Sequence, residues 1–221
     1  MNVILEIGRT RIFASAVDWP GWSRAGRDEA AALQALSDYG LRYAGALSGA
    51  RLGFRPPAGP ARFSVIERLP GNATTDFGAP EADWPSDGEP VSAADMRRFT
   101  RLLTAVWGTL DTAVQAARGR ELRKGPRGGG RDLAGILEHV QGGDASYLSR
   151  LGGQLPRGAP AELALTRQVM LETLARSAHG EVPELGPRGG RRWTARYFVR
   201  RLAWHELDHA WEIEDRAGLV G

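Results

Sequence analysis

Apolar residues recur every three or four positions through the second half of the chain, which is the period of an amphipathic α-helix. The clearest stripe has six members, namely Met96, Phe99, Leu103, Val106, Leu110 and Val114. Ser92 and Asp95 form a capping pair where this helix starts. The same period predicts three further helices, over residues 132–151, 160–178 and 194–216.

Short connections between these helices favour an up-down-up-down four-helix bundle. The pentapeptide Gly-Pro-Arg-Gly-Gly precedes the second helix at residues 125–129 and the fourth at residues 186–190. We interpret the two copies as loops at one end of the bundle, so the second and fourth helices are expected to be parallel. The loops are either glycine linkers or a rim that binds an anion.

The start of the chain has a different pattern, in which short β-prone runs surround one helix. Residues 2–7 and 11–17 are two such runs, and the three residues between them predict a β-hairpin. Residues 28–43 have an apolar stripe at helical spacing, and residues 61–69 predict another strand. We therefore expect an α+β protein whose first part, residues 1–78, is a small ββαβ domain.

In residues 79–91 the apolar residues follow neither the helical nor the strand spacing. The stretch contains three prolines and four acidic residues, which is typical of a linker or surface loop. This segment would join the ββαβ domain to a helical domain over residues 92–221.

Composition narrows the class of protein. The chain has 221 residues, of which 42% are hydrophobic and 25% charged, as in ordinary globular proteins. It has no cysteine, so any metal must be held by His, Asp or Glu. We find no apolar run of about 18 to 20 residues and no signal pattern, and we expect a cytoplasmic protein without a membrane segment.

The sequence pI of about 9.8 invites a nucleic-acid interpretation. However, the formal net charge is only +3 and Lys124 is the sole lysine, so the high pI reflects mainly the pKa of arginine. The arginines are spread along the chain, so we do not expect sequence-specific nucleic-acid binding. A small-molecule substrate is the expected partner, and a homodimer is left open.

Two of the four histidines, His205 and His209, are four residues apart on the last predicted helix. Residues at this spacing share one helix face, so both rings can reach one metal ion. A lone inward histidine is usually an ordinary core residue, but two neutral buried rings need partners for all their nitrogens, which a metal provides. His139, on the second predicted helix, offers a third ligand.

The string from His205 through Glu206 to His209 also matches the HExxH signature of zinc peptidases. Such peptidases need a third ligand beyond the motif, after a glycine turn or on a later helix. Glu212 stands where that turn would need glycine, and twelve residues follow His209. We therefore disfavour the peptidase interpretation.

The order of these histidines over four helices resembles the DinB/YfiT-like superfamily of metal-binding four-helix bundles. In that family, one histidine on the second helix and a His-x-x-x-His pair on the fourth form a three-histidine site. The resemblance covers residues 92–221 and rests on Ile136-Leu137-Glu138-His139-Val140 and Leu202-Ala203-Trp204-His205-Glu206-Leu207-Asp208-His209. It implies a divalent ion, zinc or nickel above all, on His139, His205 and His209.

The family includes thiol-dependent S-transferases and isomerases, among them a mycothiol-dependent maleylpyruvate isomerase. Three neutral imidazoles leave the ion's charge uncompensated and a coordination position open, which lowers the pKa of a bound thiol or water. Because the chain has no cysteine, a thiol would come from a small-molecule cofactor such as mycothiol. A thiol-dependent transferase or isomerase and a hydrolase of a small substrate both remain open.

Four neighbours of the histidines are candidates for supporting roles, each with an ordinary surface role as the alternative. Glu206 is a candidate general base. Asp208 and Glu212 are candidate acceptors for imidazole N–H groups. Arg201, one turn before the histidine pair, is a candidate ligand for a substrate carboxylate.

Residues 1–70 resemble the HicB-like antitoxin domain family. The resemblance rests on Asp18-Trp19-Pro20-Gly21-Trp22 and on Gly26-Arg27-Asp28-Glu29-Ala30-Ala31-Ala32-Leu33. It supplies no catalytic groups and implies an interaction role, although this part can also be a simple α+β cap on the helices. The alternative function is therefore a non-catalytic binding or regulatory protein with a structural metal.

Overall fold

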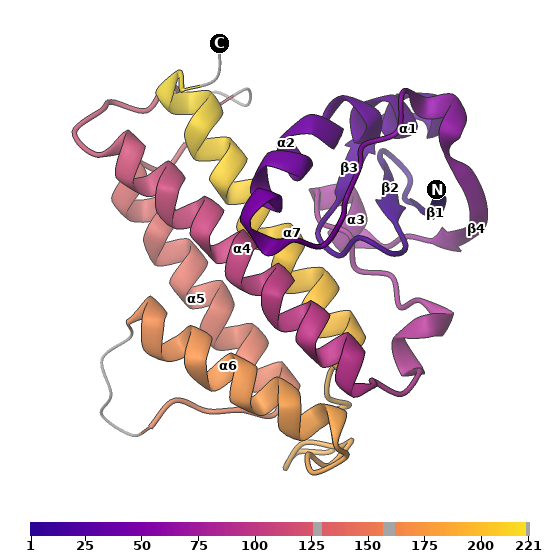
Figure 1. Cartoon of the computed structure of the whole chain (residues 1–221), viewed down its shortest axis with the longest axis vertical. Coiled ribbons are helices and arrows are strands. Elements are labelled where there is room, and N and C mark those ends of the chain that lie inside the picture. The colour runs from indigo at the N-terminus through magenta and orange to yellow at the C-terminus, as the bar shows by residue number, and fades with distance from the viewer. Residues whose placement is uncertain (126–129, 157–161, 220–221) are drawn as a thin grey trace.

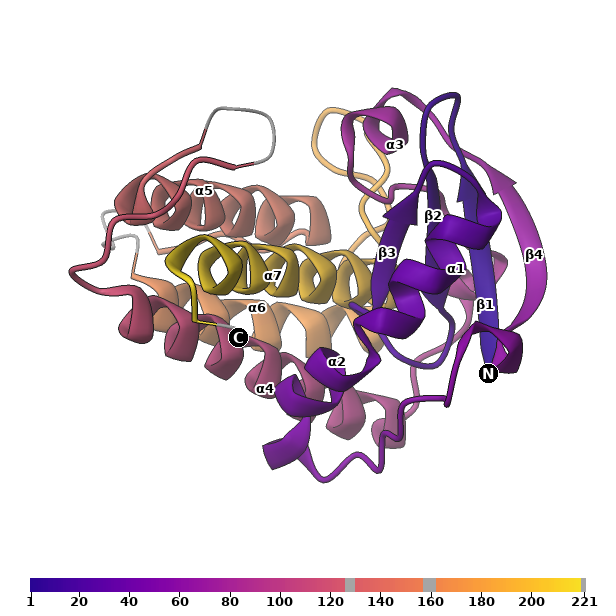
Figure 2. The same cartoon turned by 90° about the horizontal axis from the view of Figure 1, so that it is seen from above.

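The computed structural model describes residues 1–125, 130–156 and 162–219. Within these residues the protein is α+β, with a small mixed sheet and its helices on one side of four long helices (Figures 1 and 2). No helix in the described ranges is long and apolar enough to cross a membrane.

The sheet has four strands in the order β3-β2-β1-β4. The strands are β1 (Asn2–Ile7), β2 (Ile12–Ala16), β3 (Ser23–Gly26) and β4 (Ser64–Pro70). β2 is antiparallel to both β1 and β3, whereas β4 is parallel to β1. The predicted hairpin is confirmed, but the ββαβ prediction lacked β3. That strand has four residues and no β-branched or aromatic side chain, so its sequence alone gives little strand signal.

The helix predicted over residues 28–43 is two helices, α1 (Glu29–Asp38) and α2 (Gly40–Ala46), which meet at Tyr39. The side chain of Asp28 caps α1 by accepting a hydrogen bond from the backbone of Ala31. α1 packs on β2 and β3. Two 3₁₀ turns, η1 (Ser48–Ala50) and η2 (Pro60–Arg62), lie between α2 and β4.

The segment expected to be a linker is packed against the protein. It follows α3 (Ala73–Phe77) and contains the 3₁₀ turn η3 (Pro85–Gly88). The buried carboxylate of Glu6 accepts hydrogen bonds from the backbone N–H groups of Glu81 and Ala82. Asp87 is also buried, and its carboxylate lies 2.5 Å from the guanidinium of Arg200. Residues 79–91 therefore connect the sheet to the last helix through specific polar contacts.

The four long helices are α4 (Ala93–Ala117), α5 (Leu133–Leu151), α6 (Leu163–Ala178) and α7 (Ala195–Ala217). They lie side by side in both views (Figures 1 and 2). Each overlaps a predicted helix, with ends that differ by a few residues. The expected proline in the first turn of the third helix, Pro160, lies outside the described residues, as does most of the first glycine-rich loop.

The predicted alternation of helix directions is wrong. The backbone N–H of Trp193, just before α7, donates to the carbonyl of Arg150 near the end of α5, so α5 and α7 are antiparallel. Asp95 and Arg196 pair at the starts of α4 and α7, which are therefore parallel. α6 runs in the same direction as α5 (Figure 1). The eleven residues between α5 and α6 can span about 36 Å, which exceeds the roughly 28 Å length of α5 and allows this return.

One hydrophobic core joins the sheet to the helices. It contains Val3 and Leu5 of β1 together with Leu102 of α4 and Phe198 and Leu202 of α7, all of them buried. A second cluster fills the space where α4, α5 and the end of α7 meet. The N-terminal part is therefore held to the helices by continuous apolar packing.

α7 lies between these two parts and is buried on both sides. Along the side that faces the N-terminal part, four contacts follow one another. They are Ala203 with Gly21, Trp204 with Phe13, Asp208 with Arg24, and Trp211 with Tyr39. Gly21 has a φ of 90°, and a Cβ atom there would lie 2.8 Å from that of Ala203. Glycine thus permits both this turn and its close approach to α7.

We expect Asp87→Ala to lower the free energy of unfolding by about 3 to 5 kcal/mol, because it leaves the buried charge of Arg200 without its partner. Urea denaturation followed by circular dichroism measures this change. Glu29→Ala is the control, because it breaks an exposed ion pair with Arg68 and should have a far smaller effect. Equal losses in the two variants would contradict this account.

Candidate metal centre

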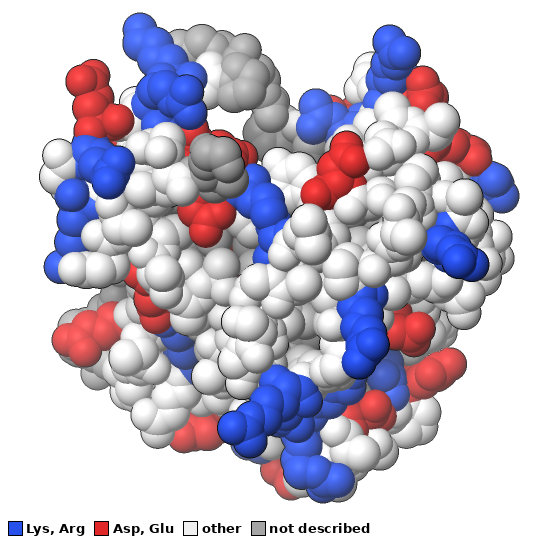
Figure 3. Space-filling model, turned by 45° about the horizontal axis from the view of Figure 1, so that its top comes forward, with Lys and Arg blue, Asp and Glu red and all other residues white. Residues whose placement is uncertain are grey.

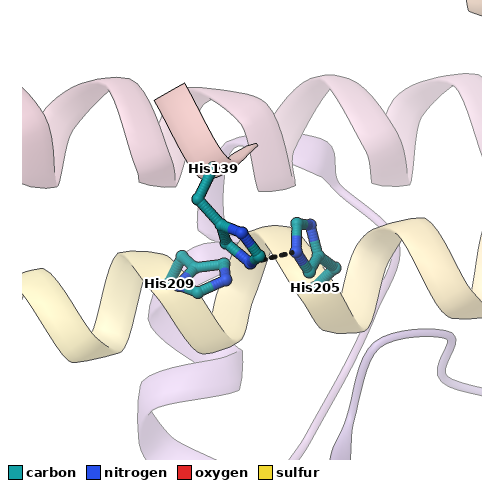
Figure 4. Close-up of side chains that lie close together, drawn as sticks. All are labelled: His139, His205 and His209. Carbon is teal, nitrogen blue, oxygen red and sulfur yellow. Dashed lines mark hydrogen bonds between the residues drawn. The ribbon is translucent and has the colours of Figure 1, made fainter. Parts of the chain in front are cut away.

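The structure brings His139 of α5 together with His205 and His209 of α7 (Figure 4). Because the two helices are antiparallel, the start of α5 lies beside the end of α7. His139 lies about 9 Å from the start of α5, and His209 about 12 Å from the end of α7. The three side chains are therefore at one level along the helices. The sequence predicts this level from parallel helices, whereas the antiparallel direction of α5 and α7 produces it.

The separations of the three rings suit one metal ion. The Nε2 atoms of His139 and His205 are 3.4 Å apart, which is long for a hydrogen bond. Two nitrogens that each lie about 2.05 Å from a tetrahedral zinc ion are about 3.3 Å apart. One ring nitrogen of each histidine lies within 4.8 Å of the others. The one hydrogen-bond contact among the three rings is this long one between His139 and His205, and the arrangement is close to that of a ligand set (Figure 4).

The rings differ in exposure. His205 is buried, whereas His139 and His209 are only partly buried, so the group is closed on the His205 side and accessible on the side of the other two rings. The ring of His205 lies over Gly143 of α5, where a Cβ atom would approach it to 2.7 Å. Any larger residue at this position would displace the ring.

Burial also sets the protonation of two of the rings. Burial, together with the neighbouring His209 and Arg201, holds the pKa of His205 well below its ordinary value. Burial lowers the pKa of His139 as well. Both rings are therefore neutral at neutral pH, which is the form that binds metal.

Glu212 fixes the orientation of His209. The Nδ1–H of His209 donates to Oε2 of Glu212 over 2.9 Å, and Oε1 of Glu212 accepts from Arg216 over 2.7 Å. The hydrogen bond from His209, and then that from Arg216, lower the pKa of Glu212, so it is ionised. With its proton on Nδ1, His209 presents Nε2 as a free electron-pair donor.

Asp208 does not contact these imidazoles in the described structure. Its carboxylate accepts a hydrogen bond from Arg24 of β3 over 2.9 Å, and the Arg24 guanidinium lies 3.9 Å from the centre of the Tyr39 ring. Asp208 therefore belongs to the contact between α7 and the sheet.

Glu206 is fully buried beside Asp144 of α5, a residue that the sequence interpretation missed. These two carboxyls and a nitrogen of His205 lie within 4.8 Å of one another. Burial and the adjacent Asp144 raise the pKa of Glu206 well above its ordinary value, and burial raises that of Asp144. A signal for Asp144 existed in the sequence, because it occupies an inward position between Val140 and Leu148.

Arg201 is buried next to the histidines. Its guanidinium carbon lies 4.7 Å from the centre of the Trp204 ring and 5.5 Å from that of Tyr147. Its Nη1 is buried and has no hydrogen-bond partner among the described residues. Arg201 thus offers an unpaired cationic donor close to His205.

A hollow of about 990 Å³ lies elsewhere, between α2, η1, α4 and the end of α7. Its wall includes Thr104, Gly108 and Trp211 but none of the histidines. On the face drawn in Figure 3, acidic and basic side chains are interspersed. The hollow therefore offers space for a ligand, whereas the side chains that can bind a metal are the three histidines.

Comparisons of the chain with models of protein families, with curated proteins and with solved structures found no match. The likeness to DinB/YfiT-like proteins therefore rests on the histidine pattern alone.

We expect Glu206→Gln to stabilise the metal-free protein. The folded-state pKa of Glu206 lies above its ordinary value of 4.5, so the unfolded chain releases this proton first and stability falls as the pH rises above about 4.5. Glutamine has no such proton and still offers an N–H donor towards Asp144. Urea denaturation should show a larger gain at about pH 8 than at about pH 5. An equal gain at both values would contradict the raised pKa.

Proposed function

We propose that this protein is a metal-dependent member of the DinB/YfiT-like class that holds a divalent ion, zinc or nickel, on His139, His205 and His209. The convergence of three imidazoles from two antiparallel helices is the observation that supports it most strongly. Two further observations fit a metal ligand set, namely the depressed pKa values of His139 and His205 and the hydrogen bond of His209 to Glu212.

We also propose that α4, α5, α6 and α7 form the four-helix bundle of that class. Their shared apolar core and their side-by-side arrangement support this proposal. The directions are up, down, down and up. The N-terminal HicB-like part, residues 1–78, would then serve as a wall against α7, which agrees better with a cap than with an independent binding module.

The open side of the site determines what it can do. When bound, a divalent ion on three neutral imidazoles supplies positive charge and an open position at which a thiol or water loses its proton more easily. Glu212 keeps the lone pair of His209 directed at the site. Arg201 supplies a charged donor for a carboxylate on the substrate or cofactor.

Between the two reaction classes, the position of Glu206 favours thiol transfer or isomerisation over hydrolysis. Hydrolysis benefits from a protein base beside the bound water. In the described structure, Glu206 is grouped with Asp144 and His205 and not with the partly exposed His139. A thiol from a small-molecule cofactor such as mycothiol can lose its proton to solvent and needs no such base. We therefore favour a thiol-dependent transferase or isomerase.

His205→Ala and His209→Ala should abolish stoichiometric binding of zinc and nickel, because each breaks the pair of ligands that one face of α7 presents together. His139→Ala should weaken binding by more than about 100-fold. This exceeds the roughly 10- to 100-fold loss that is usual when a residue that hydrogen-bonds to a metal ligand is removed. Isothermal titration and metal analysis by mass spectrometry measure both. His179→Ala is the matched control, because His179 ends α6 away from the site. Wild-type protein that binds no metal would refute the proposal.

Cobalt-loaded protein should show a thiolate-to-cobalt charge-transfer band when a small thiol is added, because the ion keeps an open position. We expect Arg201→Gln to weaken the binding of mercaptoacetate by about tenfold while leaving neutral mercaptoethanol unchanged, since Arg201 pairs with a carboxylate. A cobalt protein that binds neither thiol would instead support a structural metal.

A further inference from the structure

Several buried polar atoms without partners lie together behind the histidine site. Within the described structure, five of them belong to just three residues, namely both carboxyl oxygens of Asp144, both of Glu206 and Nδ1 of His205. Buried polar atoms normally have a hydrogen-bond partner, so such a group calls for an explanation. None of these atoms is involved in the hydrogen bond between His209 and Glu212.

The chemistry of His205 determines what its Nδ1 must do. Its Nε2 faces His139, so Nε2 is the atom that would bind the ion. A neutral imidazole carries one proton, which must then be on Nδ1. This buried N–H needs an acceptor, and carboxyls of Asp144 and Glu206 lie within 4.8 Å of a ligand atom of His205.

We propose that Asp144 is the residue that orients His205, by accepting the hydrogen bond of its Nδ1–H, as Glu212 does for His209. The inference rests on the proposed metal site and adds a positioning residue to it. In this bond the Asp144 carboxyl would lie within hydrogen-bond range of Nδ1, closer than the 4.8 Å within which ligand atoms of the two residues now lie.

Asp144 suits this role better than Glu206 for a reason of geometry. Glu206 follows His205 directly, so its side chain leaves α7 about 100° round the helix from the ring. Asp144 approaches from α5, the helix that carries His139, and the bond would therefore join the two helices that supply ligands. The carboxyl of Glu206 then faces Asp144, and one shared proton removes the repulsion between the two acids.

A second cation among these residues is disfavoured by the charges around them. The positive charge of Arg167 acts on both Asp144 and Glu206, and that of Arg201 acts on His205. The guanidinium of Arg167, which is close enough to act on both acids, would repel a further ion. The same acids as hydrogen-bond acceptors, in contrast, are stabilised by the charge of Arg167.

Zinc affinity, measured by competition with a chelator, tests the proposal. Asp144→Ala should bind zinc about 10- to 100-fold more weakly than wild type, because the ring of His205 loses its support. Asp144→Asn keeps an acceptor oxygen of the same shape and should recover most of the affinity. Asp208→Ala is the matched control, because Asp208 pairs with Arg24 instead, and it should bind zinc as wild type does.

Proton NMR of the zinc-loaded protein adds a readout that a purely structural role would not move. The Nδ1–H of His205 should give a slowly exchanging downfield signal in wild type and in Asp144→Asn, and none in Asp144→Ala. Unchanged zinc affinity in Asp144→Ala would overturn the inference alone. Two equivalents of bound zinc, one of them lost in Asp144→Ala, would overturn it too by making the acids ligands. Wild type without zinc affinity would overturn the metal site itself.

Discussion

α7 is buried on both sides, so the N-terminal part and the other long helices pack against the same helix. One side packs against the sheet and its helices, and the other against α4, α5 and α6. A helix in this position has almost no face for water, yet this one carries arginines, acids and two histidines. Each of these groups must find a partner inside the protein. A polar group of α7 that has no partner in the protein therefore indicates where a ligand binds.

On the sheet side, two charged groups of α7 find partners within the protein. Arg200 pairs with Asp87, and Asp208 pairs with Arg24. On the helix side, the pairing is incomplete, because His205 and Arg201 have buried nitrogens without partners among the described residues. This difference between the two sides of one helix is the physical reason for placing a ligand site on the helix side.

The parts of this arrangement that depend on local sequence could be predicted, and the parts that depend on distant contacts could not. The i, i+4 spacing of His205 and His209 and the apolar stripe of α4 follow from the period of one helix. The direction of α6 depends on a connection of eleven residues, which has no period to interpret. Asp208 appeared to be a neighbour of the site because it precedes His209, whereas Arg24, its partner, is 184 residues away in the chain.

Anomalous diffraction at the zinc edge, from crystals of protein loaded with one equivalent of zinc, tests the central claim most directly. We expect one peak about 2.0 to 2.1 Å from a ring nitrogen of each of His139, His205 and His209, with a fourth position open to solvent. No peak between these rings, or a peak bound to only one of the two helices, would contradict it.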